Sequence, residues 1–238
     1  MLRIFCDFDG TASPKDIGNN FFKHFSQGKV VPLVEEFLSG GIIGREFVRR
    51  EAESIDSVTE DQFLEFVEPF ELDPFFPPFV RFCREKGVEV SVVSDGLDIY
   101  VRRLLEKAGL SDLPWYANKA EFVHVNGIGK LKVSFPHAQE HCTMCANCKC
   151  SHVLSGSAEE DVIVYVGDGR SDACPVQYAD YVFAKRRLVA HCQAKNISYF
   201  EFDTFEDVQK KVEELLSRKR LKQRWEAVTA RKNAYIAE

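Results

Sequence analysis

The sequence predicts an α/β protein whose core is a doubly wound parallel sheet, with a small helical cap domain inserted after the first strand. Short apolar runs alternate with helical patterns along most of the chain, which is typical of a parallel sheet covered on both faces by helices. One long stretch after the first run has a helical pattern throughout and no good strand. We therefore expect a core made of residues 1–15 and 71–238 and a cap made of residues 16–70.

Each core strand is predicted from a short, nearly all-apolar run. The predicted strands cover residues 2–8, 88–93, 161–166 and 181–184. Helices are expected after the cap, opened by Asp73 as the helix cap with Pro74 in the first turn, and then over residues 97–108, over 171–178, and as one long helix after Asp203. The basic segment 218–224 is interpreted as a solvated face of that last helix.

The predicted cap is rich in phenylalanine, and these side chains are expected to form its small core, with one or two of them facing substrate as the alternative. Glycines mark turns between its helices, and Thr59 begins a capping box that opens one of them. A second insertion is expected over residues 115–150. It contains a hairpin around residues 126–129, where an Asn-Gly pair favours a tight turn, and then a cluster of cysteines.

Composition and charge exclude several classes of function. Charged residues make up 29% of the chain and the net charge is −6, so nothing points to nucleic acid or to a membrane surface. The longest apolar stretches run to about eight residues, whereas a membrane-spanning helix needs roughly 20. The first residues reach acidic side chains too soon for a secretory signal, so a cytoplasmic protein is expected. The oligomeric state, monomer or homodimer, stays open.

Two aspartates follow the first predicted strand. Asp7 and Asp9 are spaced by two, which puts both carboxylates on one side of the strand. Ligands of open α/β sheets bind beyond the carboxyl ends of the strands, where these residues fall. Two carboxylates can lie this close together only if a cation binds them or if one of them keeps its proton. The structural alternative is a carboxylate pair that caps the next helix.

Two further strand ends carry polar residues to the same edge of the sheet. Ser94 offers a hydroxyl, and Asp95 and Gly96 open a helix whose N–H groups can bind phosphate. Asp168 and Asp172 add two more carboxylates. Hard oxygen ligands in this number suit Mg²⁺. A carboxylate, a metal, a hydroxyl and a lysine supply what phosphoryl transfer needs, namely positioning and cancellation of charge.

Three segments resemble motifs of haloacid dehalogenase (HAD) superfamily phosphatases, in the phosphoserine-phosphatase-like subfamily IB. They are residues 7–11 (Asp-Phe-Asp-Gly-Thr), 94–96 (Ser-Asp-Gly) and 167–172 (Gly-Asp-Gly-Arg-Ser-Asp), in the family's order and across most of the chain. The resemblance implies a Mg²⁺-dependent hydrolase that removes phosphate from a small phosphorylated metabolite through an aspartyl phosphate.

The resemblance also implies roles for individual residues. Asp7 would be the nucleophile, and Asp9 the general acid for the leaving group and then the base for water, because a crowded acidic site raises its pKa. Ser94 and Lys149 complete the implied catalytic set. The implied metal ligands are Asp7, Asp9 (through its carbonyl), Asp168 and, in support, Asp172. Phosphate or substrate contacts are implied for Gly10, Thr11, Asp16, Ser94, Asp95, Gly96 and Lys149.

Two lysines are candidates for the fourth motif, whose lysine neutralises the phosphate and the nucleophile. Lys149 precedes an apolar helix start and then the strand that ends at Asp168, which is the usual order in the family. Lys185 ends the last predicted strand and also reaches the sheet edge. We favour Lys149, and the alternative for either residue is an ordinary solvent-exposed lysine.

Two branches of the superfamily are similar to particular segments of this chain. The segment 141–149 resembles the cysteine-rich stretch before the motif lysine in phosphoethanolamine/phosphocholine phosphatases. It also resembles that stretch in the methionine-salvage phosphatase that acts on 2-hydroxy-3-keto-5-methylthiopentenyl 1-phosphate. Asp16 falls where related enzymes carry an acidic residue near the substrate, although a helix N-cap explains it equally well. Either substrate type therefore fits.

The cysteines divide into two groups. Cys6, Cys83, Cys174 and Cys192 are scattered and are expected to be small buried hydrophobes. Four others crowd together, and they are open to three interpretations: a structural zinc site, a reversible disulfide or redox role, and plain packing. These are Cys142, Cys145, Cys148 and Cys150.

Three other functions compete with a phosphatase. A phosphotransferase or phosphomutase would pass the same aspartyl phosphate to an acceptor other than water. A phosphoacceptor signalling domain also uses strand-end aspartates, but Asp9 and a cap argue against it, because such a domain keeps its aspartyl phosphate. A non-catalytic, zinc-holding interaction module would be expected to lack catalytic residues, and none is missing here.

Overall fold

The computed structural model describes residues 1–236, in which seven strands form one sheet in the order β4-β3-β2-β1-β5-β6-β7. Neighbouring strands are parallel except β3 and β4, which form an antiparallel hairpin. The strands are β1 (Leu2–Cys6), β2 (Glu89–Leu97), β3 (Trp115–Val125), β4 (Ile128–Ser134), β5 (Val162–Gly167), β6 (Tyr181–Ala184) and β7 (Phe200–Glu201). The predicted α/β fold is confirmed.

The central strand β1 lies between β2 and β5, so three motif-bearing strand ends are neighbours. Cys6 of β1 pairs with Val92 on one side and with Val166 on the other. Because all three strands run in the same direction, the segments that follow them emerge at one edge of the sheet. The four predicted strands are therefore present, and β2 continues through the residues that were expected to follow it.

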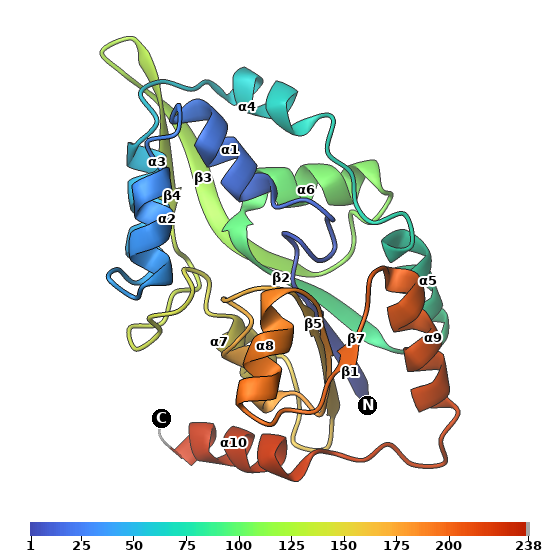
Figure 1. The fold of residues 1–238 in the computed structure, drawn as a ribbon. Coiled ribbons are helices and arrows are strands. Elements are labelled where there is room, and N and C mark those ends of the chain that lie inside the picture. The colour runs from blue at the N-terminus through green and yellow to red at the C-terminus, as the bar shows by residue number, and fades with distance from the viewer. Residues whose placement is uncertain (237–238) are drawn as a thin grey trace.

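Helices cover both faces of the sheet (Figure 1). Ile4 joins a large core with α5, α6 and α9, and Phe5 joins a smaller core with α7, the 3₁₀ helix η1 and α8, because successive strand residues point to opposite faces. These helices, with the last one of the chain, are α5 (Phe76–Glu85), α6 (Asp98–Lys107), α7 (Lys149–Ser155), η1 (Pro175–Tyr178), α8 (Arg187–Ala194), α9 (Phe205–Leu216) and α10 (Trp225–Ile236).

The segment predicted as a cap is helical, and its phenylalanines pack together as expected. Phe21 lies 4.5 Å from Phe63 and 4.9 Å from Phe25, measured between ring centres. The capping box at Thr59 is present. The helices are α1 (Ile17–Phe25), α2 (Val31–Leu38), α3 (Gly44–Glu53) and α4 (Glu60–Val67). The division of the chain into a core and a cap at residues 15 and 70 stays a prediction.

The predicted hairpin is present, and its first strand also belongs to the main sheet. β3 pairs with β2 in parallel before it continues into the hairpin with β4. Asn126 and Gly127, with φ values of 53° and 80°, make the two-residue turn. The hairpin reaches the cap helices (Figure 1), where the Val58 N–H donates to the Gly129 carbonyl at 3.1 Å. The segment after β2 thus joins the sheet to the cap.

Two predictions of helices near the end of the chain are wrong. Residues 171–178 form turns and the short η1 instead of a helix, because the Asp172 carboxylate accepts from the N–H groups of Asp168 and Gly169 and turns the chain back. The single long helix after Asp203 is two helices, α9 and α10. Arg224 lies between them and donates to the carbonyls of residues 176 and 177, which redirects the chain.

The helix after the cap begins later than predicted. It starts at Phe76, not at Pro74, and the proline in its first turn is Pro77. Asp73 still acts as a capping residue, since its carboxylate accepts from the Phe75 N–H at 2.8 Å and from the Phe205 N–H at 3.1 Å. The second bond ties α5 to the start of α9.

Among the helices of residues 1–236, none has the length and apolar character that crossing a membrane requires.

Candidate active site

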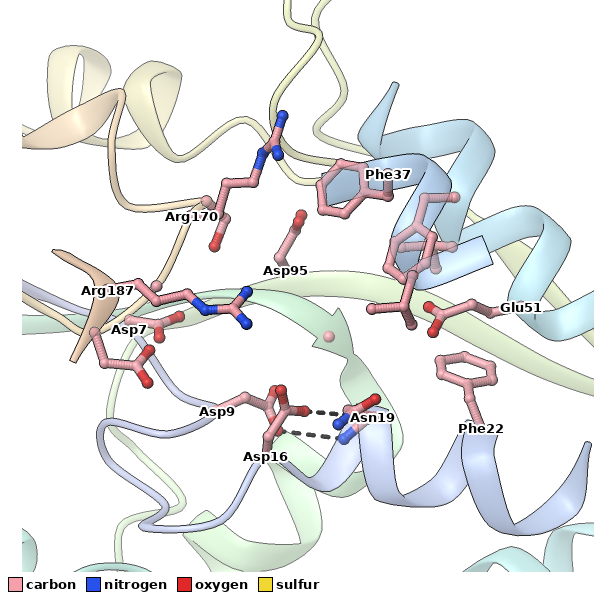
Figure 2. Close-up of a pocket in the computed structure, with 18 of the residues that line it drawn as sticks. Asp7, Asp9, Asp16, Asn19, Phe22, Phe37, Glu51, Asp95, Arg170 and Arg187 are labelled. Carbon is pink, nitrogen blue, oxygen red and sulfur yellow. Dashed lines mark hydrogen bonds between the residues drawn. The ribbon is translucent and has the colours of Figure 1, made fainter. Parts of the chain in front are cut away.

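A cavity of about 450 Å³ lies between the carboxyl edge of the sheet and the cap helices. Asp7, Asp9 and Asp168 line it from the strand ends, and α1, α2 and α3 line it from the cap. Figure 2 shows that the labelled acidic and aromatic side chains surround the same space. The strand-end residues predicted from sequence thus lie together at one edge of the sheet.

Lys149 lies at the centre of this edge and is fully buried. Its Nζ donates to Asp7 Oδ1 at 2.5 Å and to Asp172 Oδ1 at 2.7 Å. Burial alone would lower the pKa of Lys149, but the charges of Asp172 and Asp7 outweigh it and raise the pKa well above its ordinary value. The other candidate, Lys185, lies 4.6 Å from the ring centre of Phe202, outside this cluster.

Asp172 organises the loop that follows β5. Its Oδ2 accepts from the N–H groups of Asp168 at 3.0 Å and Gly169 at 2.9 Å. Its Oδ1 accepts from the Tyr165 hydroxyl at 2.7 Å as well as from Lys149. Because both oxygens are engaged, Asp172 is suited to support a metal site rather than to supply a free ligand atom.

The donor set fits a divalent cation. Carboxylate oxygens of Asp7, Asp168 and Asp172 all lie within 4.8 Å of one another. Burial, together with the charge of Asp172, raises the pKa of Asp7 and of Asp168. The Lys149 ammonium and the Arg186 guanidinium, whose Nη1 donates to Asp168 Oδ2 at 2.9 Å, provide two positive charges. Because the group holds three carboxylates, it keeps excess negative charge. Hard oxygens and uncompensated charge are the conditions that suit Mg²⁺.

The Asp9 side chain turns away from that cluster toward the cap. Its Oδ1 accepts from the Ile17 N–H at 2.8 Å, and its Oδ2 accepts from the Tyr100 hydroxyl at 2.6 Å and from Ser94 Oγ at 3.5 Å. Burial raises the pKa of Asp9 to about 7. A carboxyl with this pKa can hold or release a proton near neutral pH, which suits an acid and base. Any contact of Asp9 with a metal would therefore be made by its backbone carbonyl.

Two glycines leave room where other residues could not. Gly10 has a φ of 76°, and a Cβ there would lie 2.3 Å from Asp168 Oδ2. A Cβ on Gly96 would lie 1.6 Å from the Tyr100 hydroxyl oxygen. Thr11 is buried beside them, and its hydroxyl has no hydrogen-bond partner within residues 1–236. The two glycines therefore let the backbone lie close to the side chains of Asp168 and Tyr100.

Two other predicted contact residues have structural partners. Asp95 lines the cavity, but its Oδ1 accepts from the N–H groups of Ala146 and Asn147 at 2.7 and 2.8 Å. Asp16 is the N-cap of α1 and accepts from the Asn19 N–H at 2.8 Å (Figure 2). Both carboxylates therefore organise the walls of the cavity, and contact with a substrate stays a prediction for each.

The cysteine-rich loop separates into two parts. The sulfur atoms of Cys142, Cys145 and Cys148 lie within 4.8 Å of one another. Cys150 contacts the thiol of Cys148 on one side and that of Cys174 on the other. Cys174, predicted as a buried hydrophobe, is only half-buried and joins this row of thiols, because the turn after β5 lies against α7.

Several residues that line the cavity have no counterpart among the sequence predictions. Tyr100 follows the 94–96 motif on the first turn of α6, a position that could have pointed to it. No sequence pattern pointed to Glu51 on α3, because only the folded structure brings this residue to the cavity beside the strand ends. The residues in question are Glu51, Tyr100, Arg170, Arg186 and Arg187. The cavity is also lined by Phe22, Phe37 and Phe47 of the cap, of which one or two phenylalanines were expected to face substrate.

Comparisons with known proteins agree with this geometry. A family model described as "Putative Phosphatase" matches residues 4–217. A Brevibacillus brevis protein named 2-hydroxy-3-keto-5-methylthiopentenyl-1-phosphate phosphatase is 30% identical over 210 residues, which cover 87% of this chain and 93% of the relative. A Bacillus cereus protein of the same name is 30% identical over 221 residues, with coverages of 90% and 97%.

Solved structures show the same fold. A phosphoserine phosphatase described as a phospho-aspartyl intermediate analogue aligns with a TM-score of 0.67 at 18% identity, over 88% of this chain and 98% of its own. A substrate-bound phosphoserine phosphatase complex aligns with a TM-score of 0.67 at 19% identity, over 88% and 97%. Given the match over residues 4–217 and the relatives above, the chain belongs to this phosphatase family and is a phosphatase.

Proposed function

We propose that the protein is a Mg²⁺-dependent phosphomonoester hydrolase that works through an aspartyl phosphate on Asp7. The observation that carries this proposal is the contact of Lys149 with both Asp7 and Asp172 beside the cavity. A buried ammonium at this point neutralises the nucleophile and an incoming phosphate, and cancellation of charge is the main requirement of phosphoryl transfer.

The reaction has two steps in this proposal. A carboxylate oxygen of Asp7 attacks phosphorus while the bond from phosphorus to the leaving-group oxygen breaks, and Asp9 gives that oxygen its proton. Asp9, now ionised, then takes a proton from the water that attacks the aspartyl phosphate, which frees Asp7 and inorganic phosphate. The pKa of about 7 suits Asp9 to both transfers. Ser94 and Lys149 hold the phosphate.

The metal would be held by Asp7, Asp168 and the carbonyl of Asp9, with Asp172 in support. When bound, Mg²⁺ supplies positive charge to the phosphate oxygens. The chain's own contribution is to keep the carboxylates together, because Lys149 and the N–H groups of Asp168 and Gly169 hold Asp172 in place.

The first candidate substrate is 2-hydroxy-3-keto-5-methylthiopentenyl 1-phosphate, the compound in the names of the relatives at 30% identity. The cap supports this candidate, because it supplies an apolar wall to the cavity that suits a methylthio chain. That wall consists of Phe22, Val34, Phe37, Leu38, Phe47 and Val48.

A second candidate, a phosphorylated amino alcohol, is favoured by Glu51. This side chain faces the cavity, is 4% exposed, and has no hydrogen-bonding or ionic partner within residues 1–236 (Figure 2). Burial and the charges of Asp16 and Asp95 raise its pKa well above the ordinary value. A substrate ammonium beside Glu51 and the neighbouring aromatic rings would have both an ion pair and cation–π contacts.

The proposal is tested with a panel of phosphomonoesters assayed by release of inorganic phosphate. We expect hydrolysis that stops when Mg²⁺ is chelated and returns when it is restored. The Asp7→Asn variant should lose at least about 10³-fold in kcat, because an amide cannot act as the nucleophile. Asp112→Asn, an exposed aspartate paired with Arg84, is the matched control. Hydrolysis that survives in Asp7→Asn would contradict the aspartyl phosphate.

The two substrate candidates are separated by the Glu51→Gln variant. If the substrate is an amino alcohol phosphate, kcat/KM for it should fall by about 10-fold, which equals the loss of about 1.4 kcal/mol of binding free energy. The value for the methylthio compound should stay within about 2-fold, because the amide keeps the shape of the side chain. Glu53→Gln, an exposed position at the end of the same helix, is the control.

A further inference from the structure

Three cysteine thiols meet on the loop that precedes α7. The sulfur atoms of Cys142, Cys145 and Cys148 all lie within 4.8 Å of one another, and those of Cys142 and Cys145 are 3.3 Å apart. All three are free cysteines. Cys145 and Cys148 are buried, with 1% and 5% exposure, whereas Cys142 is half-buried. The cluster is therefore enclosed on one side and open to entry from solvent on the other.

This arrangement is that of a thiolate metal site. Zn–S bonds of about 2.3 Å at tetrahedral angles separate the sulfur atoms by about 3.8 Å, which lies within the spread of the cluster. A disulfide would use two sulfurs and leave the third thiol unexplained.

The loop that carries the thiols is anchored to β2, so the cluster is not a chance feature of a mobile segment. Ala146 and Asn147 donate their N–H groups to Asp95 Oδ1. The Asn147 side chain also donates to the Ser94 carbonyl at 2.7 Å. The His137 carbonyl accepts from the Cys148 N–H at 3.1 Å. These bonds hold the backbone between the second and third cysteines in one conformation.

We propose that Cys142, Cys145 and Cys148 bind one zinc ion as a structural site. Soft thiolate ligands in a compact cluster select zinc over the hard cations that suit the strand-end aspartates. The fourth position is filled by water or by Cys150, whose thiol contacts that of Cys148. The site is separate from the carboxylate cluster of Asp7 and its neighbours, and none of the three thiols takes part in the proposed phosphoryl transfer.

The zinc site has a consequence for Lys149, and this part rests on the proposed function. Cys148 directly precedes Lys149, so a metal bound to the three thiols would hold the backbone at the start of α7. Lys149 would then be kept in reach of Asp7 and Asp172 without a search through other conformations. Loss of zinc should lower kcat by weakening this placement, whereas the binding of zinc itself does not depend on catalysis.

The test is the metal content of the whole protein, purified under reducing conditions without chelators and measured by plasma mass spectrometry. We expect about one zinc per chain. Cobalt bound in its place should give the visible bands of a tetrahedral ion and thiolate-to-metal charge transfer in the near ultraviolet. Cys142→Ser and Cys148→Ser should lose the metal and the bands. Cys192→Ser, which removes a buried thiol on α8, should keep both.

Wild-type protein that binds neither zinc nor cobalt would overturn the proposal, and so would a disulfide among these cysteines in the unreduced protein. If a serine variant does not fold, the stoichiometry and the cobalt spectrum of the wild type still decide the question. Lys149→Met should keep its zinc while losing activity. A failure of the zinc site and a failure of the phosphatase mechanism are thereby told apart.

Discussion

Among single residues, Lys149 is the one on which the candidate site depends most. It is the only charged partner that bonds directly to both Asp7 and Asp172 within the described residues, and all three side chains are buried. Removing one partner of a buried ion pair is costly, because the remaining charges stay out of water without compensation. We therefore expect the lysine to be important for stability as well as for the proposed catalysis.

Replacement of Lys149 by Met should therefore lower both quantities. We expect kcat/KM to fall by about 10³-fold and the free energy of unfolding by about 3 kcal/mol. Steady-state kinetics and urea denaturation measure the two effects. The matched control is Lys185→Met, which removes a lysine whose Nζ lies 4.6 Å from the ring centre of Phe202. Normal activity in Lys149→Met, or a comparable loss in Lys185→Met, would mean that the wrong lysine was assigned.

Asp9 should give the enzyme a falling pH profile above neutrality. Burial raises its pKa to about 7. In the proposed mechanism Asp9 must be protonated in the free enzyme to act as the general acid. The value of kcat/KM should accordingly fall as the pH rises through about 7. The measurement is kcat/KM from pH 5 to 9, with a substrate whose own phosphate ionisation is corrected for.

The Tyr100→Phe variant tests whether Asp9 is the group that titrates. The Tyr100 hydroxyl donates to Asp9 Oδ2 and so stabilises the carboxylate. Its removal should raise the Asp9 pKa and move the falling limb to higher pH, by about one unit for a hydrogen bond to a charged group. Tyr199→Phe, which changes a hydroxyl bonded to Gln193, is the control. An unmoved limb would assign the titration to another group.

At the scale of elements, the site depends on how closely the turn after β1 approaches the turn after β5. Gly10 and Gly109 both have positive φ, 76° and 71°, but only Gly10 faces another element. A Cβ at Gly10 would meet Asp168 Oδ2 at 2.3 Å, whereas a Cβ at Gly109 would meet nothing within 4 Å. The two positions therefore separate backbone strain from close approach.

Alanine at Gly10 and at Gly109 should give different results. Each variant should lose about 1 kcal/mol of stability from strain in the left-handed region. Only Gly10→Ala should also lose activity, by about 10²-fold, because it pushes Asp168 away from Asp7. Thermal denaturation and kcat/KM provide the comparison. Equal activity in both variants would show that the turn does not control the geometry of the site.

The strands and helices also differ in how well they could be predicted from the sequence. The strands that lead to Asp7, Ser94 and Asp168 were predictable, because each contains a short apolar run in a chain with clear alternation. The helix expected over residues 171–178 was not, since its turns are made by Asp172 bonding to the backbone of the preceding loop. The break between α9 and α10 likewise depends on Arg224 meeting carbonyls of η1, about 50 residues earlier.

At the scale of the whole molecule, one side chain ties the loop after β5 to the cap. Arg170 donates to the Leu38 carbonyl at the end of α2, and its guanidinium lies 5.0 Å from the ring centre of Phe37. Phe37 in turn stacks on Phe47 of α3 at 4.5 Å. The same aromatic pair lines the cavity, so this tie also helps to hold one wall of the candidate site in place.

Loss of this tie in Arg170→Ala should loosen the contact of α2 with the loop after β5. We expect KM to rise by about 10-fold and proteolysis of the segment 16–70 to become faster, because the cation–π contact and the hydrogen bond together are worth about 1–2 kcal/mol. Arg84→Ala, which breaks an exposed pair with Asp112, is the control. Unchanged KM and unchanged proteolysis in Arg170→Ala would exclude a role for this contact in holding the wall of the cavity.

The sequence by itself determined the fold class, the strands of the central sheet and the identity of the strand-end residues, because apolar runs and motif spacing are local properties of the chain. Only the tertiary structure decided what meets the strand ends from far away: Glu51 from the cap, Tyr100 beside Asp9, and Cys174 beside Cys150. It also separated Lys149, buried among carboxylates, from Lys185 on a phenylalanine ring. Such contacts join residues remote in sequence, and they follow from packing of the whole chain rather than from any local pattern.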